Sequence, residues 1–410
     1  MRHRILVPAL VAVGLALAVA AIFAPVLDTG FWSPEDLRDL ATAAAAHSSG
    51  KPLLAFQPAL TGGYPTNPVF GLEFHFFQLN PRPYFATNLL VHWINAVLAY
   101  LLINVLLHDR RSAGLAAGLF ALSVGSYGKN LMVAVGISSL IYAMTVLAGT
   151  LLYVLNEKRN AGRPLGLYAL GFYTLFAGSL FMHGGTFSLL ACFAFYNLFF
   201  RAERGRRVLH VNLLVCLGLL VVAYAWRFAT GSNHSNAGVD AGAFLRNVPG
   251  YLTLMVFPLH QSQLLDTAPP LVRAVYAVAP VIRIFVGLSI LSYSLFGFVF
   301  GSRALRFYIA WMYIMIVPFA FLRYPADWLN LRFLYLVSVG FCVLMTTGTL
   351  YVFKLLSHHR TRRWLPFAIP AGYVVLTAAL IHTLDLKNEQ LSEAPATRER
   401  QAQIAALLES

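Results

Sequence analysis

Charged residues are scarce in this sequence of 410 residues. Asp, Glu, Lys and Arg together make up 11% of it, whereas 59% of the residues are hydrophobic. Soluble globular domains contain about 25% charged and about 45–50% apolar residues. Together with a mean hydropathy of +0.68, this composition excludes a soluble globular protein, a disordered chain and a fibre.

Cysteines and cofactor motifs are scarce as well. The three cysteines, Cys192, Cys216 and Cys342, lie in apolar stretches without a Cys-x-x-Cys spacing, so neither a disulfide framework nor a zinc site is predicted. No other spacing of His, Asp and Glu indicates a metal site. A P-loop, a Gly-rich dinucleotide turn and a Gly-x-Ser-x-Gly elbow are missing. We predict no cofactor and no metal, and ATP-driven transport and a lipase of that type are poorly supported.

Apolar residues instead arrive in blocks of about 20, the length that a helix needs to cross roughly 30 Å of hydrocarbon. We predict an all-α, polytopic membrane protein with about eleven transmembrane helices. The first block runs to Val26, longer than the apolar core of a signal peptide, so we expect it to be a retained helix. The predicted spans are 5–26, 84–107, 113–127, 131–155, 165–182, 186–200, 208–229, 276–300, 307–322, 333–355 and 364–384.

The basic residues indicate how the chain is oriented. The formal net charge is +14, from 30 basic and 16 acidic residues. Seventeen of the basic residues precede the first span or lie in alternate connections, which is typical of cytoplasmic loops. We therefore predict a cytoplasmic N-terminus, an external C-terminus and no nucleic-acid partner. The excess of Arg over Lys favours a GC-rich bacterium, and hence a bacterial cytoplasmic membrane.

Four segments organise the chain. A transmembrane domain is predicted over 1–384 and a polar C-terminal tail over 385–410, with a surface helix at 396–408. Residues 27–83 form a long outer loop that holds five of the 16 acidic residues. Residues 241–262 are apolar but break the alternation of charge, and they contain Pro249 and Pro258. We predict a re-entrant or interfacial segment there.

The outer loop contains a helix start followed by carboxylates. Ser33 suits the N-cap, Pro34 the first helical position, and Glu35 and Asp36 the first turn, so a helix is predicted over 34–47. Glu35, Asp36 and the nearby Asp39 could act as a general base or bind substrate or metal. They could equally complement the positive end of the helix dipole.

Several polar residues near membrane spans are further candidates. Arg332, with Tyr335, could bind a phosphate or extend to the headgroups. His92 shares a helix face with two asparagines, and it could face substrate or form hydrogen bonds between helices. Lys129 could bind an anionic substrate or anchor the interface. Arg246, on the outer half, could meet a lipid phosphate or simply contact headgroups.

Three segments together resemble the GT-C superfamily of integral-membrane glycosyltransferases, especially the branch of protein O-mannosyltransferase-like and tetratricopeptide-bearing transmembrane proteins. The segments are Phe31-Trp32-Ser33-Pro34-Glu35-Asp36, then Phe70-Gly71-Leu72 through Asn80-Pro81 into Asn88–Leu98, and finally Leu331-Arg332 through Tyr335 to Phe341. The stretch from Leu245-Arg246 to Pro258-Leu259 resembles the re-entrant region of that branch more loosely. Two features differ: Thr66-Asn67-Pro68 stands where many relatives have an Arg-Pro step, and no tetratricopeptide repeats follow.

The resemblance implies a site and a reaction. Asp36, or Glu35 in second place, would activate an acceptor hydroxyl, and Arg332 with Tyr335 would meet the phosphate of a polyprenyl-phosphate sugar. Arg246 is assigned a donor contact by position only, and many such members need no metal. The expected function is inverting transfer of a sugar to an unknown glycan, lipid or protein of the cell envelope. Membrane lipids are the other expected partners of the protein. A non-catalytic membrane partner related to these enzymes and a transporter of lipid-linked substrates remain alternatives.

Overall fold

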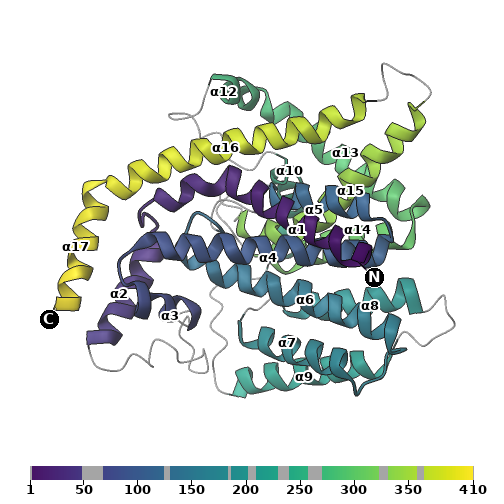
Figure 1. Cartoon of the computed structure of the whole chain (residues 1–410), viewed down its shortest axis with the longest axis horizontal. Helices are drawn as coiled ribbons and strands as arrows, with labels where there is room; N and C mark the ends of the chain where they lie inside the picture. The colour runs from purple at the N-terminus through teal and green to yellow at the C-terminus, as the bar shows by residue number, and fades with distance from the viewer. Residues whose placement is uncertain are drawn as a thin grey trace.

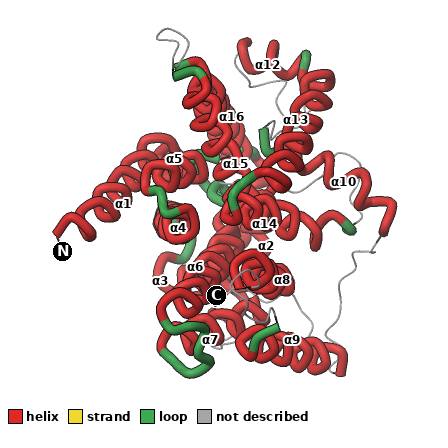
Figure 2. Tube along the Cα trace, turned by 90° about the vertical axis from the view of Figure 1, so that its right-hand side faces the viewer, coloured by secondary structure: helices red, strands yellow, loops and turns green. Residues whose placement is uncertain are grey.

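The described part of the molecule is helical almost throughout. The computed structural model describes residues 2–48, 68–123, 130–182, 186–201, 209–229, 240–256, 270–322, 331–357 and 364–409. No β-strand occurs within these ranges (Figure 2). Inside a bilayer no water can satisfy backbone N–H and C=O groups, so helices that bond their own backbone are the expected solution. The prediction of an all-α membrane protein is confirmed.

Seven described helices, some extended by a neighbouring 3₁₀ turn, are long and apolar enough to cross a membrane. They include α1 (Arg2–Phe23), α4 (Pro81–Leu107), α6 (Ile137–Arg159), α13 (Ala279–Phe300), α14 (Arg303–Ala320), α15 (Leu334–Leu355) and α16 (Ala368–Glu393).

Shorter helices occupy the other predicted spans. These are α5 (Arg110–Ala121), α7 (Leu167–Met182), α8 (Thr186–Tyr196) and α9 (Val211–Ala229), with a π-helical turn, η5 (Asn197–Arg201), directly after α8. Each of the eleven predicted spans therefore coincides with a helix. The number of eleven transmembrane helices is not confirmed, because among the described residues only seven segments meet both the length and the apolar composition that a crossing requires.

α4 lies at the centre of the bundle. It packs against α1, α5 and α6, and α15 closes the group through its contact with α5 (Figures 1 and 2). α7 packs on α6, and α9 packs on α7 and α8. The two chain ends lie at opposite ends of the long axis, the N-terminus at the right of Figure 1 and the C-terminus at the left. The end at the left holds the outer-loop helices.

α14 and α15 approach each other very closely. A side chain at Gly340 would collide with the backbone oxygen of Tyr308, and the indole N–H of Trp311 donates to the carbonyl of Leu336 at 2.8 Å in the buried interface. Lipid tails are as apolar as the helix surfaces, so close backbone packing and interhelical hydrogen bonds stabilise such contacts. The pair forms a rigid support for the residues that precede α15.

The outer loop builds a small layer at the left end of Figure 1. After η1 (Ala24–Asp28) come α2 (Pro34–Ser48) and α3 (Pro68–Phe77). α2 matches the predicted helix within one residue, and the Ser33 hydroxyl accepts a hydrogen bond from the Glu35 N–H at 3.2 Å, as an N-cap does. α17 (Pro395–Glu409) folds back against α2. The side chain of Gln401 donates to the carbonyl of Phe31 at 2.8 Å.

The segment that breaks the charge alternation forms α10 (Ala241–Leu254). Its 14 residues span only about 21 Å at 1.5 Å per residue, which is too short for the hydrocarbon core. The side-chain amide of Asn247 donates to the carbonyls of Ala320 and Leu322, both at 2.9 Å, where α14 ends. The later helix α12 (Pro270–Ala277) packs on α13 and α16.

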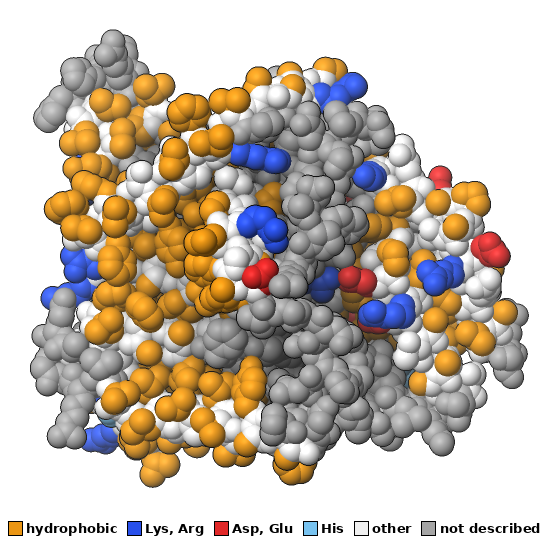
Figure 3. Space-filling model, turned by 180° about the vertical axis from the view of Figure 1, so that it is seen from behind, with side chains coloured by type: hydrophobic (Ala, Val, Ile, Leu, Met, Phe, Trp, Pro, Cys, Tyr) orange, Lys and Arg blue, Asp and Glu red, His pale blue; other side chains and the backbone are white. Residues whose placement is uncertain are grey.

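Hydrophobic side chains cover much of the surface. Seen from behind, they dominate the left half of the view, and the acidic side chains lie from the centre to the right, towards the end of the outer-loop helices (Figure 3). On α13 alone, Val281, Ile284, Phe285 and Leu288 are each more than half exposed. Such a surface is stable next to lipid and would be unfavourable in water.

Candidate active site

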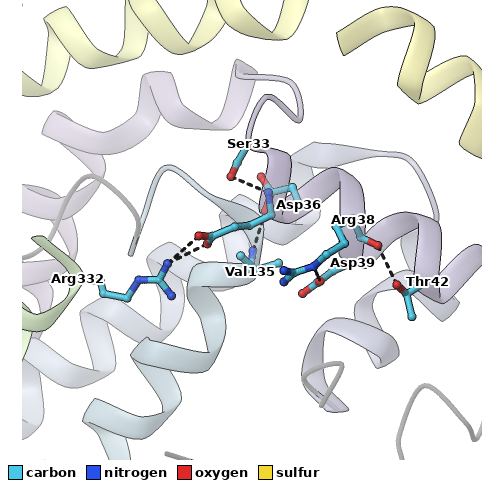
Figure 4. A network of polar contacts seen from close by, with 8 residues as sticks. Ser33, Asp36, Arg38, Asp39, Thr42, Val135 and Arg332 are labelled. Atoms are coloured by element: carbon cyan, nitrogen blue, oxygen red, sulfur yellow. Dashed lines mark hydrogen bonds and ion pairs between the residues drawn. The ribbon is translucent and has the colours of Figure 1, made fainter. Parts of the chain in front are cut away.

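A salt bridge joins the outer loop to the start of α15. Nη2 of Arg332, in the 3₁₀ turn η7 (Leu331–Phe333), lies 2.9 and 3.0 Å from the two carboxylate oxygens of Glu35 in α2. The side chains of Glu35 and Arg332 are 30% and 26% exposed, so the pair can be reached from outside. Figure 4 shows Arg332 at the left of the view and the Arg38–Asp39 pair further along α2. Two residues singled out separately from the sequence are thus brought together across 297 positions.

Asp36, the next residue along α2, faces the protein interior instead. It has no exposed surface, and its Oδ1 accepts a hydrogen bond from the Val135 N–H at 3.0 Å (Figure 4). Burial raises its pKa from 3.8 to about 7, although the backbone N–H groups of Val135 and Ala134 favour the ionised form. At neutral pH this carboxyl group therefore exchanges readily between its acid and base forms.

The segment that leads into α6 holds both halves of this site. Asp36 bonds to it as described, and the indole N–H of Trp32 donates to the Met132 carbonyl at 2.8 Å. The Asn130 side chain donates to the Arg332 carbonyl at 3.3 Å. The segment 130–135 therefore fixes α2 and η7 relative to each other. Sequence reasoning missed these contacts, because in each of them one of the two groups belongs to the backbone.

His92 and Tyr335 meet in the core beneath the salt bridge. Nε2 of His92 lies 3.0 Å from the Ala121 carbonyl, which can only accept, so this nitrogen carries the proton of the neutral ring. Nδ1 then accepts from the Tyr335 hydroxyl at 2.6 Å, and that hydroxyl accepts from the Asn95 amide at 3.1 Å. His92 and Asn95 are fully buried and Tyr335 is 2% exposed. The hydroxyl and the imidazole thus bind each other and face away from solvent.

Of the remaining predicted site residues that the structure describes, Asp39 and Arg246 are not partners in the salt bridge. Asp39 pairs with Arg38 at 3.0 Å, and burial raises its pKa above the usual value. Arg246 is exposed on α10. Lys129 lies outside the described residues, as does the segment 323–330 that precedes η7.

Apolar side chains line a small crevice next to Arg332. It measures about 30 Å³, and Tyr142, Met315, Phe319 and Leu336 contribute to its walls together with the base of Arg332. The rings of Phe319 and Phe333 stack beside it, with centroids 3.7 Å apart. The guanidinium group at the edge of this apolar wall offers a planar fork of donors that suits a carboxylate or a phosphate.

A second buried carboxyl group lies close by in α3. Glu73 is 5% exposed, and burial raises its pKa to about 8. The sequence showed it only as one of the acids in the outer loop and assigned it no role. Within the described residues, no three His, Cys, Asp or Glu side chains come close enough to hold a metal ion.

Comparison with known proteins finds matches by structure and none by whole-chain sequence. No protein-family model matches the chain, and no curated protein matches it significantly. Archaeal oligosaccharyltransferase AglB from Archaeoglobus fulgidus, in complex with an inhibitory peptide and a dolichol-phosphate, superposes with a TM-score of 0.52 and 14% identity. That match covers 93% of this chain and 56% of the archaeal one.

Two further structures of the Archaeoglobus fulgidus oligosaccharyltransferase give the same result. Its complex with Zn and sulfate has a TM-score of 0.51 and 15% identity, over 92% of this chain and 53% of that one. Its apo form has a TM-score of 0.51 and 12% identity, over 97% and 59%. The chain thus spans a little more than half the length of the structures it matches. At this identity the likeness concerns the fold alone: the chain shares the fold of the Archaeoglobus fulgidus oligosaccharyltransferase over the matched part.

Proposed function

We propose that this protein is a membrane glycosyltransferase that moves a sugar from a polyprenyl-phosphate donor to an acceptor hydroxyl at the outer membrane face. The observation that carries the proposal is the accessible Glu35–Arg332 salt bridge beside an apolar crevice, in a GT-C-type fold. The archaeal structure with a dolichol-phosphate supports a lipid-linked donor by analogy. The acceptor could be a glycan, a lipid or a protein.

The salt bridge suggests how a donor would enter. The guanidinium group of Arg332 donates hydrogen bonds to the carboxylate of Glu35. A donor phosphate would replace Glu35 there, because phosphate also accepts hydrogen bonds from the planar guanidinium fork. The hydrocarbon chain would extend along the apolar side of Arg332 into the membrane. Tyr335 lines the same crevice but bonds to His92, so we assign both residues the task of positioning the start of α15.

The transfer step then needs a base and a stabilised leaving group. The acceptor oxygen attacks the anomeric carbon while the bond from that carbon to the phosphate oxygen breaks, which inverts the anomeric configuration. The electron pair of the broken bond stays on the phosphate, and Arg332 stabilises the growing negative charge. The proton of the acceptor hydroxyl passes to a carboxylate. We assign this role first to Asp36, whose pKa of about 7 would suit proton transfer at neutral pH once the acceptor reaches the buried carboxyl group.

Glu35 is the second candidate for the base. It is more exposed than Asp36 and becomes available once phosphate has displaced it from Arg332. We also propose, from the sequence analysis, that Asp39 and Lys129 bind substrate and that Arg246 contacts the donor.

The experiment that tests the proposal measures release of polyprenyl phosphate. Purified protein is mixed with polyprenyl-phosphate sugars and extracted cell-envelope acceptors. We expect turnover by the wild type, none by Asp36→Asn, and much weaker donor binding by Arg332→Ala. Arg398→Ala is the matched control, because this arginine lies at the same end of the molecule, 65% exposed. Turnover that survives both Asp36→Asn and Glu35→Gln would refute the assignment of the base.

One observation favours the second candidate, a non-catalytic membrane partner related to these enzymes. Asp36 is buried and holds α2 against Val135, a role that needs no chemistry. A wild-type protein that folds but neither binds nor turns over any polyprenyl-phosphate sugar would favour this candidate. Inverted repeats, which transporters often contain, are not evident in the sequence, so transport is the weakest alternative.

We also propose that the N-terminus is cytoplasmic and the site external, in a bacterial cytoplasmic membrane. The three native cysteines are buried, so single exposed cysteines can report orientation. In intact cells, Arg398→Cys should react with an impermeant thiol reagent, and Arg110→Cys should react only after the membrane is opened. The reverse pattern would overturn this orientation.

A further inference from the structure

A second cavity, of about 610 Å³, lies at the end of the bundle opposite the salt bridge. It opens where α4 and α6 end, beside η5 and the first turn of α14. Four basic side chains line it, namely His108, Lys158, Arg303 and Arg306, together with apolar residues such as Leu107 and Phe200. The charge distribution assigns this end to the cytoplasm. The mechanism proposed for sugar transfer uses none of these residues.

Local backbone conformation and hydrogen bonds place the basic side chains around the same cavity. His108 ends α4 with φ of 57°, in the left-handed region that non-glycine residues rarely adopt. Its Nε2 lies 3.2 Å from Nζ of Lys158. One N–H of the Arg306 guanidinium donates to the Val299 carbonyl at 2.9 Å, which holds that side chain beside the first turn of α14.

Among the described residues, no acidic side chain lines the cavity. The two nearest acids in sequence are engaged elsewhere. Asp109 accepts from the Arg111 N–H at 3.0 Å as the N-cap of α5, and Glu157 forms a buried salt bridge with Arg201. The lining therefore carries an excess of positive charge, which attracts an anion.

The position of the cavity favours a lipid over a soluble anion. The last apolar turn of α4, which ends at Leu107, and the ring of Phe200 form part of the wall, at the level where spanning helices leave the hydrocarbon. Basic pockets between transmembrane helices on the cytoplasmic side bind lipid headgroups in this way. A volume of about 610 Å³ also lies within the range of small-molecule sites, roughly 300–1,000 Å³.

We propose that this basic cavity binds the phosphate of an anionic phospholipid headgroup. The phosphate meets Arg303, Arg306 and Lys158, and the glycerol and upper acyl carbons lie against Leu107 and Phe200. The site is separate from the site of sugar transfer, so the proposal stands or falls independently of that activity.

Native mass spectrometry of the delipidated full-length protein in detergent tests this proposal. We expect wild-type protein to bind phosphatidylglycerol at least tenfold more tightly than phosphatidylcholine, which has no net charge. The double variant Arg303→Gln/Arg306→Gln should lose at least fivefold in affinity for phosphatidylglycerol. The control Arg110→Gln/Arg111→Gln removes the same charge from exposed positions at the same end, outside the cavity, and should bind like the wild type.

Three outcomes would overturn the proposal. Equal losses in the two double variants would mean attraction by general surface charge. Binding of inorganic phosphate or glycerol phosphate as tight as that of phosphatidylglycerol would identify a soluble phosphate compound as the ligand. If the Arg303→Gln/Arg306→Gln variant fails to fold, the variants Arg303→Lys/Arg306→Lys and Lys158→Gln replace it. The lysine pair should retain binding of phosphatidylglycerol, and Lys158→Gln should weaken it. The third refuting outcome is unchanged binding in Lys158→Gln.

Discussion

Asp36 offers the sharpest test of the site, because one substitution should alter both the activity and the pH dependence of stability. The group is fully buried, and its pKa is raised from 3.8 to about 7 by desolvation. If Asp36 is the catalytic base, as proposed, it must be ionised, and its ionised fraction rises from about one tenth at pH 6 to about nine tenths at pH 8. Turnover at saturating donor should therefore increase about tenfold across this interval.

The same shift makes a prediction about stability that does not depend on the donor. The folded state holds the proton more tightly than the unfolded state. The stability that this provides is fully present below about pH 4 and is lost as the pH rises towards about 7. At 1.36 kcal/mol per pKa unit, the free energy of unfolding should fall by about 2 kcal/mol between pH 5 and pH 7, and by about 4 kcal/mol in all. Asp36→Asn cannot ionise and should lack this contribution.

The assay combines the release of polyprenyl phosphate with thermal unfolding in detergent, followed by tryptophan fluorescence. Wild-type protein should lose more Tm between pH 5 and pH 7 than Asp36→Asn. The control Glu389→Gln removes an exposed carboxyl group at the same end of the molecule and should behave like the wild type. A rate that stays level from pH 6 to pH 8, or identical pH dependence of Tm in wild type and Asp36→Asn, would refute the reasoning.

Three other substitutions test the packing and protonation around the site. Between pH 5 and pH 7 wild-type protein should lose about 2 kcal/mol of stability that Glu73→Gln does not lose, because the pKa of Glu73 in the folded state is about 8. A difference in Tm between the two proteins that is the same at both pH values would contradict the burial of this carboxyl group. Tyr335→Phe should cost about 1–3 kcal/mol in thermal stability, because it leaves His92 and Asn95 without their buried partner, and an unchanged Tm would speak against the network. Gly340→Ala should lower the stability by about 1–3 kcal/mol through overpacking against α14; a variant as stable as wild type would show that the helices can separate there.

Features with a local cause were accessible from the sequence. The helix α2 could be predicted to within one residue, because capping by Ser33 and the fixed φ of Pro34 act inside a single turn. Apolar blocks likewise revealed where helices occur. Their lengths were less accessible, since composition does not distinguish a short buried helix from a span. α8, for example, has only 11 residues before the π-helical turn η5.

Features that depend on distant partners were not accessible. Glu35 and Arg332 were each candidates, but nothing in a single sequence joins positions that are 297 residues apart. The partner of Asp36 is a backbone N–H of Val135, which any residue except proline would supply. His92 was expected to face either substrate or another helix, and only the position of Tyr335 selects the second.

The contrast between Glu35 and Asp36 follows from helix geometry. Neighbouring residues on an α-helix point about 100° apart, so an acidic pair on a helix at a membrane surface must place its members in different surroundings. On α2 one carboxyl group meets Arg332 and solvent, whereas the other meets the backbone that leads into α6. Burial then shifts the pKa of Asp36 towards neutrality, while the salt bridge keeps Glu35 next to the cation. If the sugar-transfer proposal is right, the two carboxyl groups have different roles. Glu35 binds Arg332 until the donor phosphate replaces it, and Asp36 accepts the proton.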